Sequence, residues 1–240
     1  MTHTLQNFIK KQSFEPGFAG LFLNPFFFIR RALHKKIRAL APQLTGKLLD
    51  FGCGRKPYEH LFHVDEYIGI DMEHTGHEHT NSKVDVYYDG KNIPFPDNTF
   101  DSVFCSEVFE HVFNLEEVIQ EIKRVTKPGG RMLITVPFAW NEHEIPFDFA
   151  RYTSFAIKDI LERNGFTVLQ LEKSGNFARV MFQLWALYFY NIIHTRNKVL
   201  NFILRMIFII PINIVGSLLL PLFPKDTTLY FNNVVVAEKR

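Results

Sequence analysis

The stretch from Thr45 to Leu171 alternates short apolar or β-branched runs with segments of helical periodicity, and this alternation constrains the fold most strongly. Such a pattern is typical of a parallel sheet covered by helices. The predicted strands are Lys47–Phe51, Tyr67–Asp71, Lys83–Tyr87, Ser102–Cys105, Arg131–Val136, Thr167–Leu171 and, near the C-terminus, Leu229–Ala237. The predicted helices are Pro57–Leu61, Asn114–Val125 and Ser154–Asn164, the last with Ser154 as N-cap and Gly165 after its end. The sequence therefore predicts an α/β fold.

Length and composition narrow the organisation of the chain. At 240 residues it can form one good-sized domain, and a net charge of +2 gives no field strong enough to indicate a nucleic-acid partner. Two cysteines are too few for a disulfide framework, and the N-terminus lacks the apolar core of a secretory signal. We therefore expect a cytoplasmic, single-domain protein. Its predicted parts are an N-terminal helical cover (1–44), a cofactor-binding core (45–175), an apolar hairpin (176–224) and the last strand (225–240).

The predicted hairpin is unusual because residues 176–224 contain no Asp or Glu. Its two apolar runs, Phe177–Ile193 and Met206–Phe223, are about long enough to span a membrane, and the basic joint His194–Lys198 separates them. Because predicted strands of one sheet flank the hairpin, it crosses a membrane twice or not at all. Two crossings would place the basic joint on the far side, against the positive-inside rule.

We therefore favour a hairpin that lies in or dips into the cytosolic leaflet, over a protein-packed or dimer-forming cover and over a double span. Pro211 and Pro221 are expected to interrupt its second helix. The segment Leu21–Leu40 is apolar at its start and basic afterwards. It either covers the sheet as a helix or faces a membrane, in which case residues 17–34 join the hairpin in a peripheral attachment to the inner face of the cell membrane.

The first predicted strand runs into a glycine-rich loop, Asp50-Phe51-Gly52-Cys53-Gly54-Arg55-Lys56-Pro57-Tyr58. A strand that ends this way places backbone N–H groups at the carboxyl edge of a parallel sheet, where ligands of open α/β folds bind. A dinucleotide fingerprint needs a third glycine where Pro57 stands, and no Gly-Lys-Ser/Thr phosphate motif follows. The loop therefore favours a phosphate-free adenosyl ligand that carries a carboxylate. Arg55 and Lys56 either lie near that carboxylate or are solvated surface charges.

Further motifs follow at regular intervals. They are Asp71 at the end of the second strand, the segments Asp89–Asp101 and Ser106–Val112, and Lys127-Pro128-Gly129-Gly130. Together with the glycine loop they resemble the class I S-adenosylmethionine-dependent methyltransferases of the type 11 group, over roughly Leu48 to Leu171. The resemblance implies a seven-stranded, Rossmann-like sheet whose last strand is antiparallel, and S-adenosylmethionine as the cofactor.

The resemblance also implies roles for individual residues. It assigns the methionine part of the cofactor to the glycine loop and to the end of the fourth strand, namely to Asp50, Gly52, Gly54, Ser106 and Glu107. The ribose is assigned to Asp71, and the adenine edge to Asp89 and the backbone of Gly90. Lys56 departs from the pattern, because many members have a third glycine there, and Arg55 is the remaining candidate beside the carboxylate.

The acceptor side of the site is predicted from two histidines and a loop. Methyl transfer to a hydroxyl needs a proton acceptor, and His143 is the first choice for that base. His111 is the second, although it can equally stabilise the loop in which it lies. The loop around His143 resembles the Glu-His-x-x-Pro-x-Asp-Phe-x-Arg-Tyr-Thr loop of family members associated with surface-polysaccharide or lipid chemistry. Its predicted substrate-binding residues are Trp140, Asp148, Arg151 and Tyr152; alternatively, the last three brace the loop.

The sequence predicts methyl transfer to an oxygen or nitrogen of a small-molecule, lipid-linked or glycan acceptor, and two other functions compete with this prediction. One is a catalytically silent cofactor-binding fold that anchors a partner protein at a membrane. The other, an NAD-dependent oxidoreductase, is disfavoured by Pro57. The run Glu73–His79 holds three histidines, but its spacing matches no closed metal site, and we expect no metal there.

Overall fold

The computed structural model describes residues 3–72 and 82–240, and it divides into two compact units. The sheet unit comprises Ile37–Lys173 and Asn232–Arg240, and the helical unit comprises Met1–Lys36 and Ser174–Phe231. The predicted organisation as a single domain stays a prediction. The histidine-rich run Glu73–His79 lies outside the described residues.

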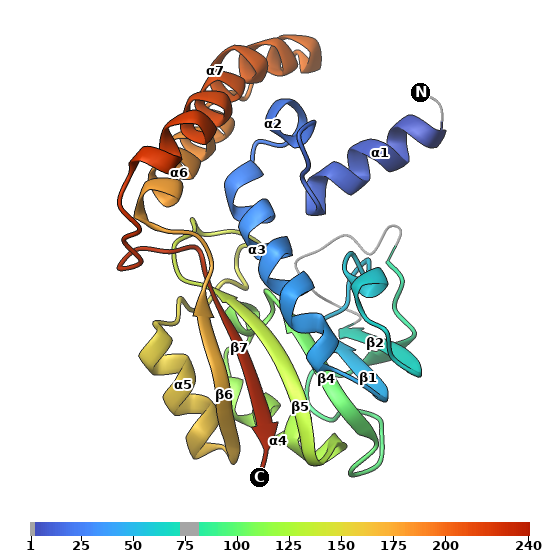
Figure 1. Cartoon of the computed structure of the whole chain (residues 1–240). Coiled ribbons are helices and arrows are strands. Elements are labelled where there is room, and N and C mark those ends of the chain that lie inside the picture. Colours follow the sequence, from blue (N-terminus) through green and yellow to red (C-terminus); the bar gives the residue numbers. More distant parts are fainter. Residues whose placement is uncertain (1–2, 73–81) are drawn as a thin grey trace. The chain divides into compact units, whose positions relative to one another are not determined.

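The sheet unit contains seven strands in the order β3-β2-β1-β4-β5-β7-β6 (Figure 1). Their bounds are β1 Lys47–Phe51, β2 Glu66–Met72, β3 Val86–Tyr88, β4 Phe100–Ser106, β5 Thr126–Pro137, β6 Phe166–Lys173 and β7 Asn232–Lys239. Neighbouring strands from β3 to β5 are parallel, whereas β7 lies antiparallel between β5 and β6. This arrangement confirms the predicted seven-stranded sheet with an antiparallel last strand.

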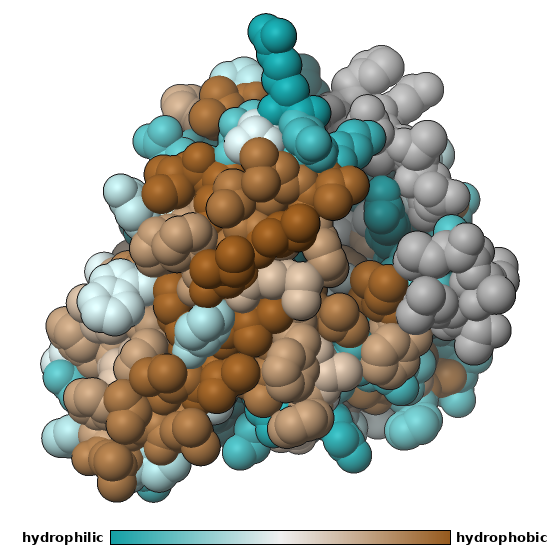
Figure 2. Space-filling model, turned by 90° about the horizontal axis from the view of Figure 1, so that it is seen from above, coloured by the Kyte–Doolittle hydropathy of each residue, from teal (hydrophilic) through white to brown (hydrophobic). Residues whose placement is uncertain are grey.

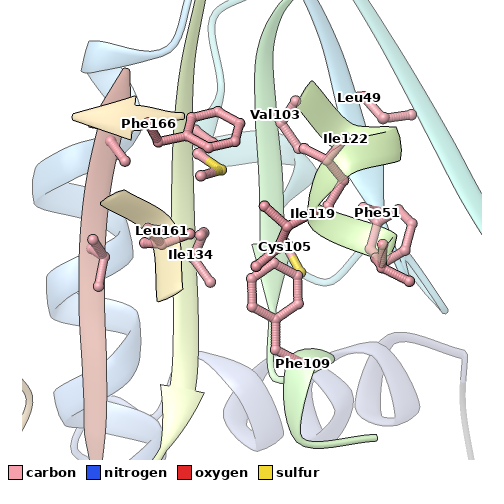
Figure 3. Packing of buried hydrophobic residues seen from close by; sticks show 14 of the residues in the cluster. Leu49, Phe51, Val103, Cys105, Phe109, Ile119, Ile122, Ile134, Leu161 and Phe166 are labelled. Carbon is pink, nitrogen blue, oxygen red and sulfur yellow. The ribbon is translucent and has the colours of Figure 1, made fainter. Parts of the chain in front are cut away.

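One face of the sheet packs against α4 (Leu115–Val125) and α5 (Ser154–Arg163). The apolar side chains of α4 recur at helical spacing and are buried as one stripe, and they meet alternate residues of the central strands. Figure 3 shows part of this cluster, with Phe51, Cys105, Ile119, Ile134 and Leu161 gathered between strands and helices. Burial of this set holds the strand ends, and hence the loops that follow them, in a fixed frame.

Several local predictions for the sheet unit need correction. Strand β5 begins at Thr126 rather than at Arg131, and β7 begins at Asn232 rather than at Leu229. The predicted helix Pro57–Leu61 is only a 3-10 turn, η2 (Glu59–Leu61), and β3 is shorter than predicted and begins at Val86. The N-cap of α5 is Thr153 rather than Ser154, because the Thr153 side chain accepts a hydrogen bond from the Ala156 N–H at 3.2 Å. Gly165 follows the helix with φ +92°, which confirms its predicted position.

The helical unit contains α1 (His3–Phe14), α2 (Gly20–Leu23), most of α3 (Phe27–Leu40), α6 (Phe177–Ile192) and α7 (Lys198–Leu219). The predicted stretch Leu21–Leu40 is not one helix, because Asn24-Pro25 ends α2 and begins a turn into α3. Helix α6 begins at the predicted Phe177 and ends at Ile192, one residue before the predicted end. In Figure 1 α6 and α7 lie side by side.

The predicted interruption of the second hairpin helix at Pro211 is wrong, because α7 is continuous over 22 residues with Pro211 inside it. The helix also begins earlier than predicted, at Lys198. Asn197 explains this start, since its side chain accepts hydrogen bonds from the N–H groups of Val199 and Leu200 at 2.9 and 3.2 Å. Pro221 lies beyond α7, in the 3-10 turn η4 (Leu220–Leu222).

A buried glutamine joins two helices of this unit. Gln183 of α6 is fully buried, and its Oε1 accepts hydrogen bonds from the N–H groups of Phe28 and Ile29 at 3.0 and 3.2 Å. Its Nε2 donates to the Pro25 carbonyl at 2.9 Å. The first N–H groups of a helix have no partner within the helix, so Gln183 satisfies two such donors at the start of α3.

Candidate active site

The glycine loop after β1 is fixed by the end of β2. The N–H groups of Gly52 and Cys53 donate to the Ile70 carbonyl at 2.9 and 3.0 Å, and the Gly54 N–H donates to Asp71 Oδ2 at 3.0 Å. Gly52 has φ +73°, and a Cβ there would lie 2.4 Å from a methyl group of Val108. Only glycine fits this position without strain. The sequence-predicted residues of this loop and Asp71 therefore lie together.

Asp50, the last acid before the loop, is 3% exposed, and the Tyr67 hydroxyl donates to its Oδ2 at 2.6 Å. Burial raises the pKa of Asp50 to about 7, although the hydrogen bond from Tyr67 and the positive charge of Lys56 both act to lower it. The site thus contains a carboxyl group whose protonation changes near neutral pH.

Lys56 occupies a left-handed conformation, φ +50°, where the family resemblance places a glycine. Its side chain is buried, forms an ion pair with Asp85, and places its Nζ 5.3 Å from the centre of the Tyr67 ring. Gly69 leaves room for it, because a Cβ on that residue would lie 2.4 Å from Lys56 Cε. Lys56 is therefore not the solvated surface charge that was one predicted alternative. Arg55 is exposed, and its predicted place beside a carboxylate stays a prediction.

The predicted adenine-binding turn follows β3. Asp89 is exposed, and its Oδ1 accepts hydrogen bonds from the N–H groups of Lys91 and Asn92, both at 2.8 Å. These backbone bonds lower the pKa of Asp89. Gly90 has φ +80°, and a Cβ there would lie 2.8 Å from Met72 Cε. Hydrogen bonds from backbone N–H groups to Asp89 thus hold the turn, and these two bonds use only one of the two carboxylate oxygens of Asp89.

At the end of β4, Ser106 and Glu107 join a polar network that sequence reasoning missed. Ser106 Oγ lies 2.8 Å from Thr135 Oγ1, and this hydroxyl lies 2.8 Å from Glu107 Oε1. The other oxygen of Glu107 accepts a hydrogen bond from Asn232 Nδ2 at 2.7 Å. Glu107 itself has φ +57°. The available signal for the network was the Asn232-Asn233 pair, which is polar at the start of an otherwise Val-rich strand.

The loop after β5 is braced by an ion pair. Asp148 is paired in two-pronged fashion with Arg151, at 2.6 Å to Nη1 and 2.7 Å to Nη2, and its Oδ2 also accepts from the His143 N–H at 2.9 Å. These bonds outweigh burial and lower the pKa of Asp148 to about 2. Asp148 and Arg151 therefore brace the loop, as one of the two predicted alternatives states. Binding of an acceptor by these two residues, by Trp140 and by Tyr152 stays a prediction.

The two predicted bases lie together. The rings of His111 and His143 have centroids 4.8 Å apart. The Nε2 atom of His111 lies 3.7 Å from Glu110 Oε1 and 3.6 Å from Glu144 Oε2, and His143 Nε2 lies 3.9 Å from Glu144 Oε1. Burial lowers the pKa of His143 and, with the nearby negative charge of Glu107, raises the pKa of Glu110 well above its ordinary value. Sequence reasoning missed both glutamates of this cluster.

Part of the sheet unit is similar to known methyltransferases. Residues 49–134 match the family model of a methyltransferase domain. Among curated proteins, a sterol 24-C-methyltransferase of Gibberella zeae is 36% identical over 97 residues, which are 35% of this chain and 26% of that protein. A 27-O-demethylrifamycin SV methyltransferase of Amycolatopsis mediterranei is 30% identical over 116 residues, 42% of this chain and 43% of that one. The chain thus spans less than half the length of these two relatives.

A solved structure shows the same fold. A methyltransferase of Haloferax volcanii, determined in complex with the Trm112 activator, superposes with a TM-score of 0.55 at 17% identity, over 87% of this chain and 90% of that one. At this level of identity the likeness concerns the fold alone.

Proposed function

We propose that this chain, in which residues 49–134 match the family model of a methyltransferase domain, is a class I S-adenosylmethionine-dependent methyltransferase that methylates an oxygen or nitrogen of a small-molecule, lipid-linked or glycan acceptor at a membrane surface. The family binds S-adenosylmethionine, and the loop geometry around Gly52, Gly54 and Asp71 suits an adenosyl ligand without phosphate. The names of the two curated relatives specify one carbon and one oxygen position, so they do not choose the acceptor atom.

Methyl transfer from a sulfonium is an in-line displacement with a good leaving group. The protein therefore acts chiefly by holding donor and acceptor in line, and it takes up a proton when the acceptor is a hydroxyl. The predicted proton acceptors, His143 and His111, follow β5 and β4 at the carboxyl edge of the sheet, the edge at which the glycine loop follows β1. This common edge supports transfer between the two sets of residues.

The exposed apolar surface of α6 and α7 is the observation that carries the membrane part of the proposal. The segment Lys198–Leu222 is the one described helix long and apolar enough to cross a membrane, and only 17% of its most apolar window is buried. Figure 2 looks onto a broad apolar area. The exposed large apolar side chains of the two helices include Met181, Trp185, Tyr188, Ile192, Val199, Phe202, Ile203, Ile207, Val215 and Leu218. Such a continuous surface on a protein is typical of a partner or membrane contact.

A cavity of about 550 Å³ in the helical unit adds a second observation. Its lining combines apolar side chains, among them Phe27 and Phe223, with the cationic side chains of Arg31, Arg179 and Lys225. An anionic lipid headgroup attached to acyl chains is complementary to this lining, because its negative charge can pair with the cations and its chains can contact the apolar side chains. Residues 176–224 contain basic side chains but no Asp or Glu, and this positive charge also favours contact with an anionic membrane.

Two binding experiments test the proposal. Calorimetry with S-adenosylhomocysteine is expected to show one site per chain, and lack of binding at high micromolar ligand would remove the methyl-transfer proposal. Flotation with vesicles of phosphatidylglycerol and phosphatidylcholine is expected to recover the protein with the vesicles, more strongly at low salt. Retained cofactor binding without turnover on any envelope fraction would instead favour the silent anchoring protein.

Matched variants locate the surface. Replacing Trp185, Phe202 and Leu218 by Asp places charge on the proposed membrane face and is expected to abolish flotation. Replacing Phe113 and Phe155, which are 80% and 84% exposed in the sheet unit, is the control and is expected to leave flotation unchanged. If the variants of α6 and α7 float with the vesicles as well as the control variants do, then α6 and α7 do not bind the vesicles. Incubation with methyl-labelled cofactor and fractionated envelope lipids and glycans then identifies the acceptor.

A further inference from the structure

The cluster of Glu110, His111 and His143 has the geometry of a metal site. One ligand atom of each residue can be chosen so that all three lie within 4.8 Å of one another. The contacts of 3.6–3.9 Å between the imidazole Nε2 atoms and the carboxylates of Glu110 and Glu144 are too long for hydrogen bonds. A tetrahedral ion with bonds of about 2.0–2.1 Å separates its ligands by about 3.3 Å. Small inward rotations of these side chains would therefore suffice to bind one ion.

The burial of Glu110 destabilises the folded protein when no cation is bound beside its carboxylate. Glu110 is fully buried, and neither of its oxygens nor Nε2 of His111 has a hydrogen-bond partner within the described part of the chain. A buried carboxylate that is not paired loses its hydration without compensation. Arg151 does not supply it with a hydrogen bond, because its guanidinium donates to Asp148 and to the carbonyls of the loop.

The other ring nitrogens are arranged as in metal-bound histidines. His111 Nδ1 lies 2.8 Å from the Phe147 carbonyl, which can only accept, so Nδ1 carries the hydrogen and Nε2 presents its lone pair. His143 Nδ1 lies 3.2 Å from Asp148 Oδ2. Arg151 Nη2 is 3.4 Å from the same nitrogen, but its two hydrogens already point to Asp148 and Asn141. Histidine ligands of metals donate their second N–H to carbonyls or carboxylates in this way.

We propose that Glu110, His111 and His143 bind one divalent transition-metal ion, with the carboxylate of Glu144 as a further ligand. Two imidazoles with carboxylates suit Zn²⁺ and its neighbours in the first transition series better than Mg²⁺ or Ca²⁺. A backbone hydrogen bond holds the two loops of the site together without the ion, since the Phe149 N–H donates to the Glu110 carbonyl at 2.8 Å.

The proposal goes beyond methyl transfer and does not depend on it. An imidazole Nε2 that binds a metal cannot also accept a proton, so an occupied site would replace the role of base predicted for His143 and His111. Metal binding is therefore measured without cofactor or acceptor, and calorimetry with S-adenosylhomocysteine tests the proposed function separately.

The test is a zinc titration of the full chain, free of any affinity tag and treated beforehand with a chelator. We expect one Zn²⁺ per chain, a higher Tm with zinc, and a visible absorption band when Co²⁺ is used as the probe. Glu110→Gln and His143→Asn are each expected to weaken binding at least about 100-fold. Asp148→Asn, which removes the negative charge beside His143 Nδ1 and also breaks the ion pair with Arg151, is expected to weaken it about 10-fold.

Two controls decide between this site and others. Glu110→Gln without metal is expected to keep or raise the Tm, because an amide is cheaper to bury than a carboxylate; a purely structural role for Glu110 predicts a lower Tm. A variant with His74, His77 and His79 replaced by Ala is expected to bind zinc as the unchanged chain does. Binding that disappears in that variant, binding that persists in Glu110→Gln, or no binding at about 1 mM zinc overturns the proposal.

Discussion

Asp50 is expected to make the stability of the protein fall as pH rises. Its pKa is raised from the ordinary 3.8 to about 7, mainly by burial, so the folded protein binds a proton that the unfolded chain has released between these two values. The contribution of Asp50 to the free energy of unfolding is therefore largest below pH 3.8, where the carboxyl is protonated in both states, and it is lost as the pH rises to the folded-state pKa of about 7. At 1.36 kcal/mol per pH unit, the interval corresponds to about 4 kcal/mol. Asp50→Asn replaces the carboxyl by a neutral group of the same shape that can still accept from the Tyr67 hydroxyl.

The variant is therefore expected to exceed the unchanged protein in free energy of unfolding by about 2 kcal/mol at pH 5 and by about 4 kcal/mol at pH 8. Urea unfolding followed by circular dichroism at both pH values measures these differences. Asp101→Asn is the matched control of opposite sign, because hydrogen bonds from Lys127 and from the Lys47 N–H lower the pKa of Asp101. That variant should lose stability at pH 8 and lose less at low pH.

An equal change for Asp50→Asn at both pH values, or a loss at pH 8, would refute the reasoning. The hydrogen bond from Tyr67 would then outweigh burial. A second measurement separates stability from function. If the predicted role of Asp50 in the methionine pocket is right, the stabilised variant binds S-adenosylhomocysteine more weakly, which would explain why a costly carboxylate is kept there.

Three further substitutions test other parts of the structure. Thr153→Ala removes the N-cap of α5 and should cost about 1 kcal/mol in urea unfolding, whereas Ser154→Ala should cost almost nothing. Lys56→Met should cost roughly 1 kcal/mol, because the Asp85 carboxylate is 45% exposed and partly regains water; a double variant with Asp85→Asn should be less than additive. Gln183→Leu leaves two buried N–H groups without an acceptor and should cost about 2–3 kcal/mol, with faster hydrogen exchange in the first turn of α3.

The strands of the sheet were predictable because the alternation of apolar runs reports burial directly. The bounds of β1 agree with the prediction, and β2, β4 and β6 differ from it by one or two residues at either end. Local choices between equivalent residues were not predictable: Thr153 and Ser154 can both cap a helix, and only the backbone conformation decides which does. Pro211 was misjudged because one proline removes a single hydrogen bond, a loss that a long apolar helix can absorb.

In the site, the residues that sequence reasoning placed correctly depend on local geometry. Gly52 and Gly54 mark positive φ, and Asp71 marks the end of a strand that pairs with the glycine-loop strand. The glutamates around the histidines were missed because Glu110 and Glu144 come from different loops. Their proximity follows from a backbone bond between these loops, which no periodicity in the sequence reports.

The direction of the last strand explains how a residue near the C-terminus enters the site. In the parallel part of the sheet, the carboxyl ends of β1, β4 and β5 meet at one edge. Because β7 is antiparallel to β5, its first residue lies at that edge, and Asn232 pairs with Pro137. Asn232 can thus donate to Glu107, which follows β4. A parallel β7 would have brought Lys239 there instead, so the antiparallel direction of β7 places a neutral hydrogen-bond donor, and not a cation, beside the Glu107 carboxylate.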